Sequence, residues 1–247
     1  MPEKSVKKSE RIVVKKPRTA KSNGTAASSV VSATAATVAT TATLAADKRG
    51  KLETEILRHA VTMFAECGYQ GTSIASIAQQ AGVSKQNLLY YFASKPALYQ
   101  RVLDDVLDVW LARMDSLADE SREPQELLRS YIQAKLRFSR EHPSASKVYA
   151  MEVIGGAKIY GQQIRSKVIP YLRKDIASFE KWMSEGKIAT VNPTHLLFTI
   201  WAMTQSYADF STQMNLVLNQ KKLSAKDFEA AEKLIVDMVL AAVAIHN

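Results

Sequence analysis

The chain has 247 residues, of which 47% are apolar and 23% charged, enough to bury a core in one or two domains. This composition excludes fibrous, collagen-like and wholly disordered proteins. The net charge of +9 is concentrated at the front, because residues 1–49 carry +7 while residues 102–247 are neutral. A polyanionic partner would therefore meet the first third of the chain. A single cysteine, Cys67, excludes a disulfide framework and a Cys-based zinc site, which fits a cytoplasmic protein.

Residues 1–47 form a basic segment followed by an uncharged Ala/Thr/Ser-rich stretch. This order resembles a secretory signal, but Ser and Thr interrupt the stretch, and Leu44 is its only apolar side chain larger than valine. We therefore expect neither a signal nor a membrane span, and we interpret residues 1–47 as a disordered basic arm. The arm either adds non-specific attraction to DNA phosphates, or is a solubilising tail or the product of a misassigned start codon.

Residues 48–94 have the apolar spacing and the capping residues of three short helices. The first is predicted to end at Gly68, because glycine readily takes the left-handed conformation that terminates a helix. The second begins after the hydroxyl pair Thr72 and Ser73 and stops at Gly82, and the third follows at once. Two short helices joined by a tight glycine-containing turn are typical of a helix-turn-helix.

The start of the third segment, residues 85–92, carries the chemistry expected of a reader of DNA bases. Ser84 is predicted to cap this helix, and Gln86 and Asn87 can make paired hydrogen bonds to adenine. Phosphate contacts are predicted for nearby hydroxyl, phenol and ammonium side chains, namely Thr72, Lys85, Tyr90, Tyr91 and Lys95. The alternative is a helical hairpin with a polar surface.

Several blocks of this region resemble the DNA-binding domain of TetR-type transcriptional regulators. They are GYQGTSI at 68–74, AGVS at 81–84, LYYF at 89–92 and SKPAL at 94–98. The resemblance implies an all-α protein with three N-terminal helices for DNA and a C-terminal helical domain for effector binding and dimerisation. It also implies that Tyr90, Tyr91 and Lys95 touch the DNA backbone. No cofactor and no metal site are expected.

Residues 95–247 are predicted to form a helical domain, since no alternating strand pattern of useful length occurs. A long helix follows the cap Ser94, and further helical segments are expected at about 124–141, 144–156, 166–185, 193–214 and 224–245. Pro170 lies inside one segment, so that helix begins there or is bent. The last two segments are very apolar, and they either pack against the body or form a two-fold interface. The family resemblance favours a homodimer, which would read a palindromic operator.

Trp201 and Gln205 lie one helical turn apart on a segment expected to be buried. An indole beside a carboxamide suits a planar heterocycle, because the ring can stack while the amide pairs with its polar edge. Trp110, on the long helix, is a second candidate wall. From the residues by themselves, the simpler interpretation is that both indoles are core aromatics and that Gln205 pairs with a backbone group.

Residues 50–214 resemble, more narrowly, the pyrimidine-utilisation regulators of the same family. The matching blocks are NLLYYF at 87–92, DVWL at 108–111, WA at 201–202 and YADF at 207–210. This resemblance implies that Trp110, Trp201 and Gln205 line an effector pocket, and that uracil or thymine loosens DNA binding. Ser206 and residues 153–165 depart from the pattern, and if that stretch borders the pocket the effector is a different small molecule.

The predicted function is therefore a homodimeric, cytoplasmic and nucleoid-associated repressor of pyrimidine catabolism or related nitrogen-metabolism genes, without a membrane partner. The alternatives are a TetR-type regulator that answers another ligand, and an effector-independent nucleoid-associated protein. An enzyme is not expected, because the four histidines lack metal-ligand spacing and no Gly-rich phosphate loop occurs. Cys67 also precedes a predicted helix end rather than lying at an activating N-terminus.

Overall fold

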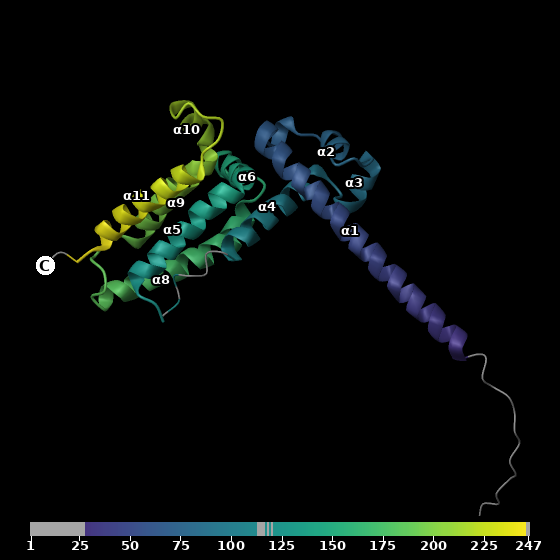
Figure 1. Cartoon of the computed structure of the whole chain (residues 1–247), viewed down its shortest axis with the longest axis horizontal. Helices are drawn as coiled ribbons and strands as arrows, with labels where there is room; N and C mark the ends of the chain where they lie inside the picture. Colours follow the sequence, from purple (N-terminus) through teal and green to yellow (C-terminus); the bar gives the residue numbers. More distant parts are fainter. Residues whose placement is uncertain (1–27, 113–116, 118, 120, 246–247) are drawn as a thin grey trace, which may run out of the picture. The chain divides into compact units, whose positions relative to one another are not determined.

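The computed structural model describes residues 28–112, 117, 119 and 121–245, and for residues 28–48 only the backbone path. Within these residues every regular element is helical and none is a strand, which confirms the predicted all-α class (Figure 1). The helices are α1 (Ser28–Gly71), α2 (Ile74–Gln80), α3 (Lys85–Tyr91), α4 (Lys95–Ala112), α5 (Pro124–Glu141), α6 (Pro143–Ile154), α7 (Gly161–Gln163), the π-helical turn η1 (Ile164–Val168), α8 (Ile169–Ser184), α9 (Pro193–Asp209), α10 (Ser211–Val217) and α11 (Ala225–Val243). None of these helices is long and apolar enough to cross a bilayer.

The chain divides into two units, residues 1–49 and residues 50–247. In the first unit the described backbone belongs to α1, which begins at Ser28 rather than near residue 48. The helix therefore enters the segment predicted as a disordered arm, whose residues 1–27 lie outside the described residues. It can extend this far because residues 28–47 contain neither Gly nor Pro and are rich in Ala, the strongest helix former.

The second unit opens with the predicted helix-turn-helix. The helical geometry of α1 is interrupted at Gly68, whose φ of 68° lies in the left-handed region. Ser73 then starts α2 through a capping box, and Gly82, with a φ of 67°, makes the turn to α3. Ser84 accepts a hydrogen bond from the backbone N–H of Asn87 and so caps α3. These starts and stops agree with the prediction from the capping residues.

One apolar core joins the helix-turn-helix to the start of α4. Each helix contributes a completely buried side chain: Phe64 from α1, Ile77 from α2, Leu88 from α3 and Leu98 from α4. The ring of Tyr99, also on α4, meets that of Phe64 edge-on, with centroids 4.9 Å apart. Because α4 continues from this core into the body, a single helix belongs to both parts of the unit.

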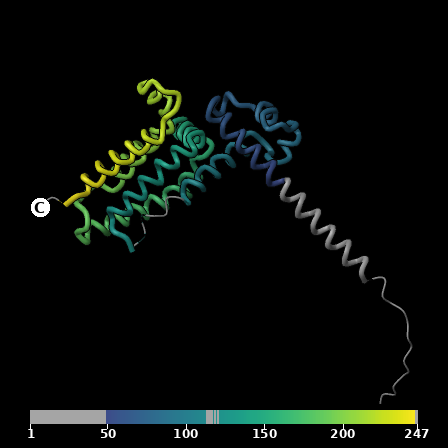
Figure 2. Tube along the Cα trace, in the orientation of Figure 1, coloured from purple at the N-terminus to yellow at the C-terminus, as the bar shows by residue number. Residues whose placement is uncertain are grey.

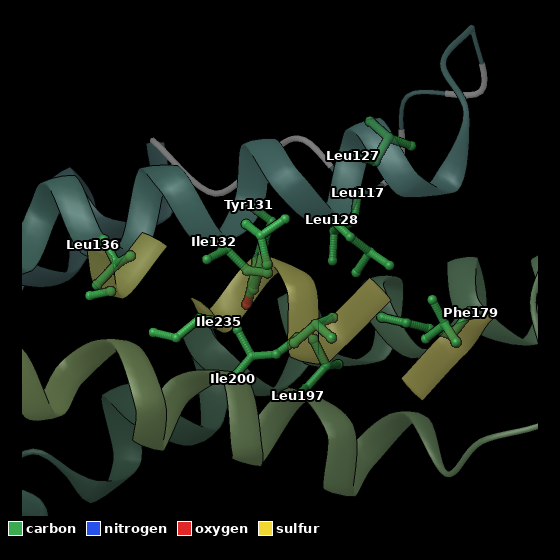
Figure 3. Close-up of a cluster of buried hydrophobic side chains, with 14 of the residues drawn as sticks. Leu117, Leu127, Leu128, Tyr131, Ile132, Leu136, Phe179, Leu197, Ile200 and Ile235 are labelled. Carbon is green, nitrogen blue, oxygen red and sulfur yellow. The ribbon is translucent and has the colours of Figure 1, made fainter. Parts of the chain in front are cut away.

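A second core holds α5, α8, α9 and α11 together (Figure 3). The traces of α5, α9 and α11 run side by side (Figure 2). Between α5 and α9, Leu128, Tyr131 and Ile132 face Leu197 and Ile200, all of them at most 1% exposed. Burial of five such side chains contributes roughly 1.5–3 kcal/mol each, so this interface is a main source of stability for the body.

The predicted helical segments of the body are present, but two are divided. Segment 166–185 is made of η1 and α8, and Pro170 lies in the first turn of α8, where its missing N–H is not needed. Segment 193–214 is divided at Phe210 into α9 and α10. Apolar spacing does not reveal such a break, because both pieces keep the helical period.

The predicted helix starts in this region are confirmed by side-chain caps. The side chain of Asn192 accepts the backbone N–H of His195 at the start of α9. Ser224 and Asp227 form a reciprocal capping box at the start of α11. A cap of this kind stabilises a helix by about 1 kcal/mol, so short polar sequences locate these N-termini.

Candidate functional site

The recognition helix α3 turns its polar residues to solvent and its apolar residue inward. Lys85, Gln86 and Asn87 form its first turn, and all three side chains are exposed. Leu88 is completely buried and holds the helix in this orientation. Three of the predicted DNA-contacting groups therefore lie together at one helix N-terminus, where an ammonium and two carboxamides can reach base edges in a major groove.

The predicted phosphate contacts flank this turn. The Oγ of Ser84 accepts the Asn87 N–H at 3.1 Å, a bond that uses a lone pair and leaves the hydroxyl proton for a phosphate. Tyr90 is 67% exposed, and its ring meets that of Tyr91 at 89°. At the start of α4, the Nζ of Lys95 lies 4.3 Å from the centre of the Tyr69 ring, a cation–π contact that orients the ammonium.

Thr72 occupies a different environment from the one expected of a phosphate contact. Its side chain is 2% exposed, and its hydroxyl donates to the carbonyl oxygens of Met63 at 3.1 Å and Gly68 at 2.8 Å. The hydroxyl therefore ties the end of α1 to the start of α2. The prediction that this side chain contacts a DNA phosphate is corrected, because its hydroxyl is buried and used within the fold; of the hydroxyl pair predicted to cap the second helix, only Ser73 is the cap.

The predicted effector-binding residues lie in the body, where α4 meets α5, α6 and α9. The rings of Trp110 and Trp201 are 5.9 Å apart and nearly perpendicular, and Tyr149 lies 6.2 Å from Trp110. The indole N–H of Trp201 donates to the hydroxyl of Tyr131 at 2.8 Å. Gln205 is partly buried and lines one small cavity together with Trp110 and Tyr149. Trp110 and Gln205 thus line the same cavity, and the ring of Trp201 packs against that of Trp110.

A lysine that the sequence prediction missed lies at the centre of this group. Lys135 of α5 is 2% exposed, and its Nζ is 4.6 Å from the centre of the Trp110 ring and 5.5 Å from that of Trp201. Among the described residues this Nζ has no hydrogen-bond partner. The signal was present in the sequence, because Lys135 follows Tyr131 by one helical turn on the apolar face of a strongly amphipathic segment.

Two carboxylates act on this lysine from neighbouring helices. Burial lowers the pKa of Lys135 to about 7, while the charges of Asp175 on α8 and Asp209 on α9 raise it. Asp209 accepts a hydrogen bond from the hydroxyl of Ser146 at 2.6 Å, and burial raises its own pKa. The group therefore combines a buried cation, aromatic faces and a few polar side chains, which is typical of small-molecule sites.

The cavity beside Gln205 is closed in this structure. Only about 10 Å³ is available to the centre of a water-sized sphere, room for about one water molecule. Sites that hold small ligands usually measure about 300–1,000 Å³. A ring compound would therefore have to displace side chains that line this cavity, among them the partly buried Trp110.

Residues 153–165, which depart from the resembled pattern, do not line that cavity. They are bound to α4 instead. The carboxylate of Glu152 accepts the backbone N–H of Tyr160 at 2.9 Å, and the Tyr160 hydroxyl donates to Asp104 of α4 at 2.7 Å. The Nζ of Lys167 also donates to the Asp104 carboxylate, at 2.8 Å. This segment thus fastens α4, the helix that leads from the end of α3 to Trp110.

Within the described residues, no three or more metal-ligating side chains come together in one group. The single cysteine, Cys67, is exposed near the end of α1. The fold therefore defines a helix-turn-helix protein with two parts. The head, made of the end of α1 with α2 and α3, carries the exposed polar residues at the start of α3, and the helical body encloses the group of aromatic and polar side chains around Lys135.

Two family models match adjacent parts of the chain. One, described as bacterial regulatory proteins of the tetR family, matches residues 56–102. The other, described as the C-terminal region of YcdC-like proteins, matches residues 103–246. The chain therefore belongs to the TetR family of bacterial transcriptional regulators.

The chain is also similar to individual regulators. It is 41% identical to RutR, the pyrimidine-utilisation regulator of Escherichia coli K12, over 66% of this chain and 76% of RutR. It is 32% identical to the repressor KstR2 of Mycobacterium tuberculosis H37Rv over 40% of this chain and 49% of that one. These relatives are transcriptional regulators and not enzymes, in agreement with the prediction.

Solved structures share the fold at lower identity. KstR2 of Mycobacterium tuberculosis superposes with a TM-score of 0.66 at 19% identity, covering 78% of this chain and 95% of that one. AibR, solved with isovaleryl coenzyme A and operator DNA, gives a TM-score of 0.60 at 20% identity, covering 76% and 97%. These likenesses establish the architecture, a helix-turn-helix head on a helical body.

Proposed function

We propose that the protein is a homodimeric repressor of genes for pyrimidine catabolism or related nitrogen metabolism, released from a palindromic operator by a small effector such as uracil or thymine. It acts in the cytoplasm at the nucleoid. The observation that carries this proposal is that Trp110 and Gln205 line one small cavity, with the Trp201 ring 5.9 Å from that of Trp110, in a chain 41% identical to RutR. A planar ring can lie against the indoles while the carboxamide pairs with its N–H and C=O groups.

Helix α4 supplies the physical connection between effector and operator. It carries Lys95 at its first residue and Trp110 near its last turn. A ligand that displaces Trp110 favours a different position of α4, and the reading heads of a dimer then no longer fit neighbouring major grooves. A difference in ligand affinity of about 1–3 kcal/mol between the two states is enough for such a switch.

The last helices support the homodimer. A groove of about 580 Å³ between α9, α10 and α11 is lined by Tyr207, Phe210 and Leu234, among others. Leu234 and Met238, one turn apart on α11, are 59% and 53% exposed. A second copy of the chain would bury this apolar face. Sedimentation equilibrium tests this: Leu234→Glu should shift the protein towards monomer, whereas Lys174→Glu, at an exposed position on α8, should not.

The direct test of the effector is fluorescence anisotropy at fixed salt, on labelled DNA from upstream of the gene and of neighbouring operons. Tight binding that uracil or thymine reverses supports the proposal. Gln205→Ala should keep the operator affinity but weaken the effector response, and an equal response in the mutant and the parent would remove Gln205 from the site.

Two alternatives have distinct outcomes in the same assay. Tight operator binding that ignores both pyrimidines, but is reversed by another small molecule, favours a TetR-type regulator of a different ligand. Binding that no small molecule alters favours an effector-independent nucleoid-associated protein.

A further inference from the structure

The buried ammonium of Lys135 is not explained by the packing of the body. Its side chain is 2% exposed, and within the described part of the chain its Nζ finds no hydrogen-bond acceptor. It lies near the rings of Trp110, Trp201 and Tyr131, at 4.6, 5.5 and 5.9 Å from the ring centres. A buried polar group without a hydrogen bond costs stability, and a methionine would fill the same space without that cost.

We propose that Lys135 is the anchor of the effector site and that its ammonium binds a carbonyl oxygen of a small planar ligand. The ring of this ligand lies against Trp110 and Trp201, and Gln205 reads its edge. This inference rests on the regulatory function proposed above and adds to it the residue that selects the chemical class of the effector.

The closed cavity is consistent with this role. Only about 10 Å³ is free beside Gln205, and the Nζ of Lys135 lies over the ring of Trp110, one of the residues that line this cavity, and near that of Trp201. An entering ring takes over the contacts with the indoles, and the displaced ammonium gains the acceptor that it lacks in the closed form. The ligand thus exchanges weak cation–π contacts for a charge-assisted hydrogen bond.

The neighbouring charges narrow the ligand class. Asp175 and Asp209 both act electrostatically on Lys135 from α8 and α9. They oppose a third negative charge next to the ammonium, so a neutral carbonyl compound is favoured over a carboxylate. The charge of Lys135 itself excludes a cationic ligand. A ring without oxygen has no carbonyl group to accept a hydrogen bond from Nζ.

Isothermal titration calorimetry on the full-length protein without DNA tests this directly. The probes are uracil, which has two carbonyl groups, benzoate, which has a carboxylate, and pyrimidine, which is the same ring as uracil without oxygen. Each is titrated into the parent, Lys135→Met and Lys174→Met. Lys174 is the matched control, because its Nζ also contacts an aromatic ring, that of Tyr171 at 5.4 Å, but the residue is exposed.

We expect the parent and Lys174→Met to bind uracil, and to bind benzoate more weakly and pyrimidine more weakly still. Lys135→Met should lose at least about tenfold in uracil affinity, the effect of one hydrogen bond to a charged group. Equal uracil binding by parent and Lys135→Met would overturn the role of the lysine. A parent that binds none of the probes, or prefers benzoate or pyrimidine, would overturn the carbonyl class.

A measurement on the unaltered chain covers the case in which Lys135→Met does not fold. In protein labelled with ¹⁵N at lysine Nζ, uracil should shift one resonance belonging to a slowly exchanging, buried amine, and the absence of any shift at saturation would overturn the proposal. The regulatory function is tested separately by operator release. If uracil releases Lys135→Met from the operator as it releases the parent, the regulatory function stands and the role of Lys135 as anchor is wrong. If uracil binding depends on Lys135 but does not release the operator, the role of Lys135 stands and the regulatory function is wrong.

Discussion

Replacing Lys135 with methionine should stabilise the fold near neutral pH, and the gain should shrink as the pH rises. Burial lowers the pKa of Lys135 from 10.5 to about 7 in the folded protein, against the opposing charges of Asp175 and Asp209. Between about pH 7 and 10.5 the unfolded chain therefore binds one more proton at this residue than the folded chain. The free energy of unfolding of the parent rises with pH across this window, because the buried amine becomes neutral.

The size of the effect follows from the same environment. One pKa unit corresponds to about 1.4 kcal/mol, so a pKa lowered from 10.5 to about 7 sets an upper bound near 5 kcal/mol. The cation–π contacts with Trp110 and Trp201 offset about 0.5–2 kcal/mol of this. Replacing buried charges with apolar groups of similar size gains about 1–4 kcal/mol. We therefore expect Lys135→Met to gain about 1–3 kcal/mol at pH 6 and under about 1 kcal/mol at pH 9.5.

Urea unfolding of parent and variant at pH 6 and pH 9.5, followed by circular dichroism, measures this difference. Other titrating groups contribute equally to the free energy of unfolding of the two proteins, so they cancel in the difference unless they are coupled to the lysine. Burial raises the pKa of Tyr131, the titratable neighbour on the same helix, so that it stays protonated across the range. Lys174→Met, at an exposed position, should change the free energy of unfolding by less than about 0.5 kcal/mol at either pH.

A variant less stable than the parent at pH 6 would refute the reasoning, because it would mean that the charged lysine stabilises the folded body. A gain of equal size at both pH values would also refute it, since the cost would then not depend on the proton. Either result would assign Lys135 to packing and remove the stability cost that marks it as a functional residue.

Three further substitutions test the reading head. Thr72→Val should lower the free energy of unfolding by about 1–3 kcal/mol, since it leaves the carbonyls of Met63 and Gly68 without their donor, and an unchanged urea midpoint would contradict the structural role. Lys85→Ala should weaken binding to specific and random DNA alike and reduce the salt slope by about 1 in anisotropy titrations; an unaffected affinity would argue against the orientation of α3. Ser84→Ala should cost about 1 kcal/mol of stability through the lost cap, measured by thermal unfolding.

The head could be predicted from sequence because its determinants are local. Gly68 and Gly82 are required by left-handed backbone angles, and Ser73 and Ser84 by caps that reach only three residues along the chain. Thr72 shows the limit of this reasoning. Its hydroxyl bonds to Met63, nine residues earlier in α1, on the other side of the helical interruption at Gly68.

The effector group was only partly predictable for the same reason. Trp201 and Gln205 share a helical face, so their spacing was informative. Lys135 acquires its meaning from Trp110, 25 positions earlier, and Trp201, 66 positions later, which tertiary packing brings within 6 Å of its Nζ. A lysine is ordinarily expected to be solvated; the spacing from Tyr131 placed Lys135 on an apolar face, but the aromatic rings that surround its ammonium are visible only in the folded body.

The same packing explains how α4 can connect the site around Trp110 to the helix-turn-helix. Its N-terminal half is locked into the head core by Leu98 and Tyr99, and its middle is fastened by Asp104 to Tyr160 and Lys167. Its last turns, by contrast, carry Trp110 against a cavity whose contents can change. A ligand that moves this end therefore acts on a helix whose other end belongs to the head core. In the proposed mechanism the effector therefore alters the position of the recognition helix, without any contact between ligand and DNA.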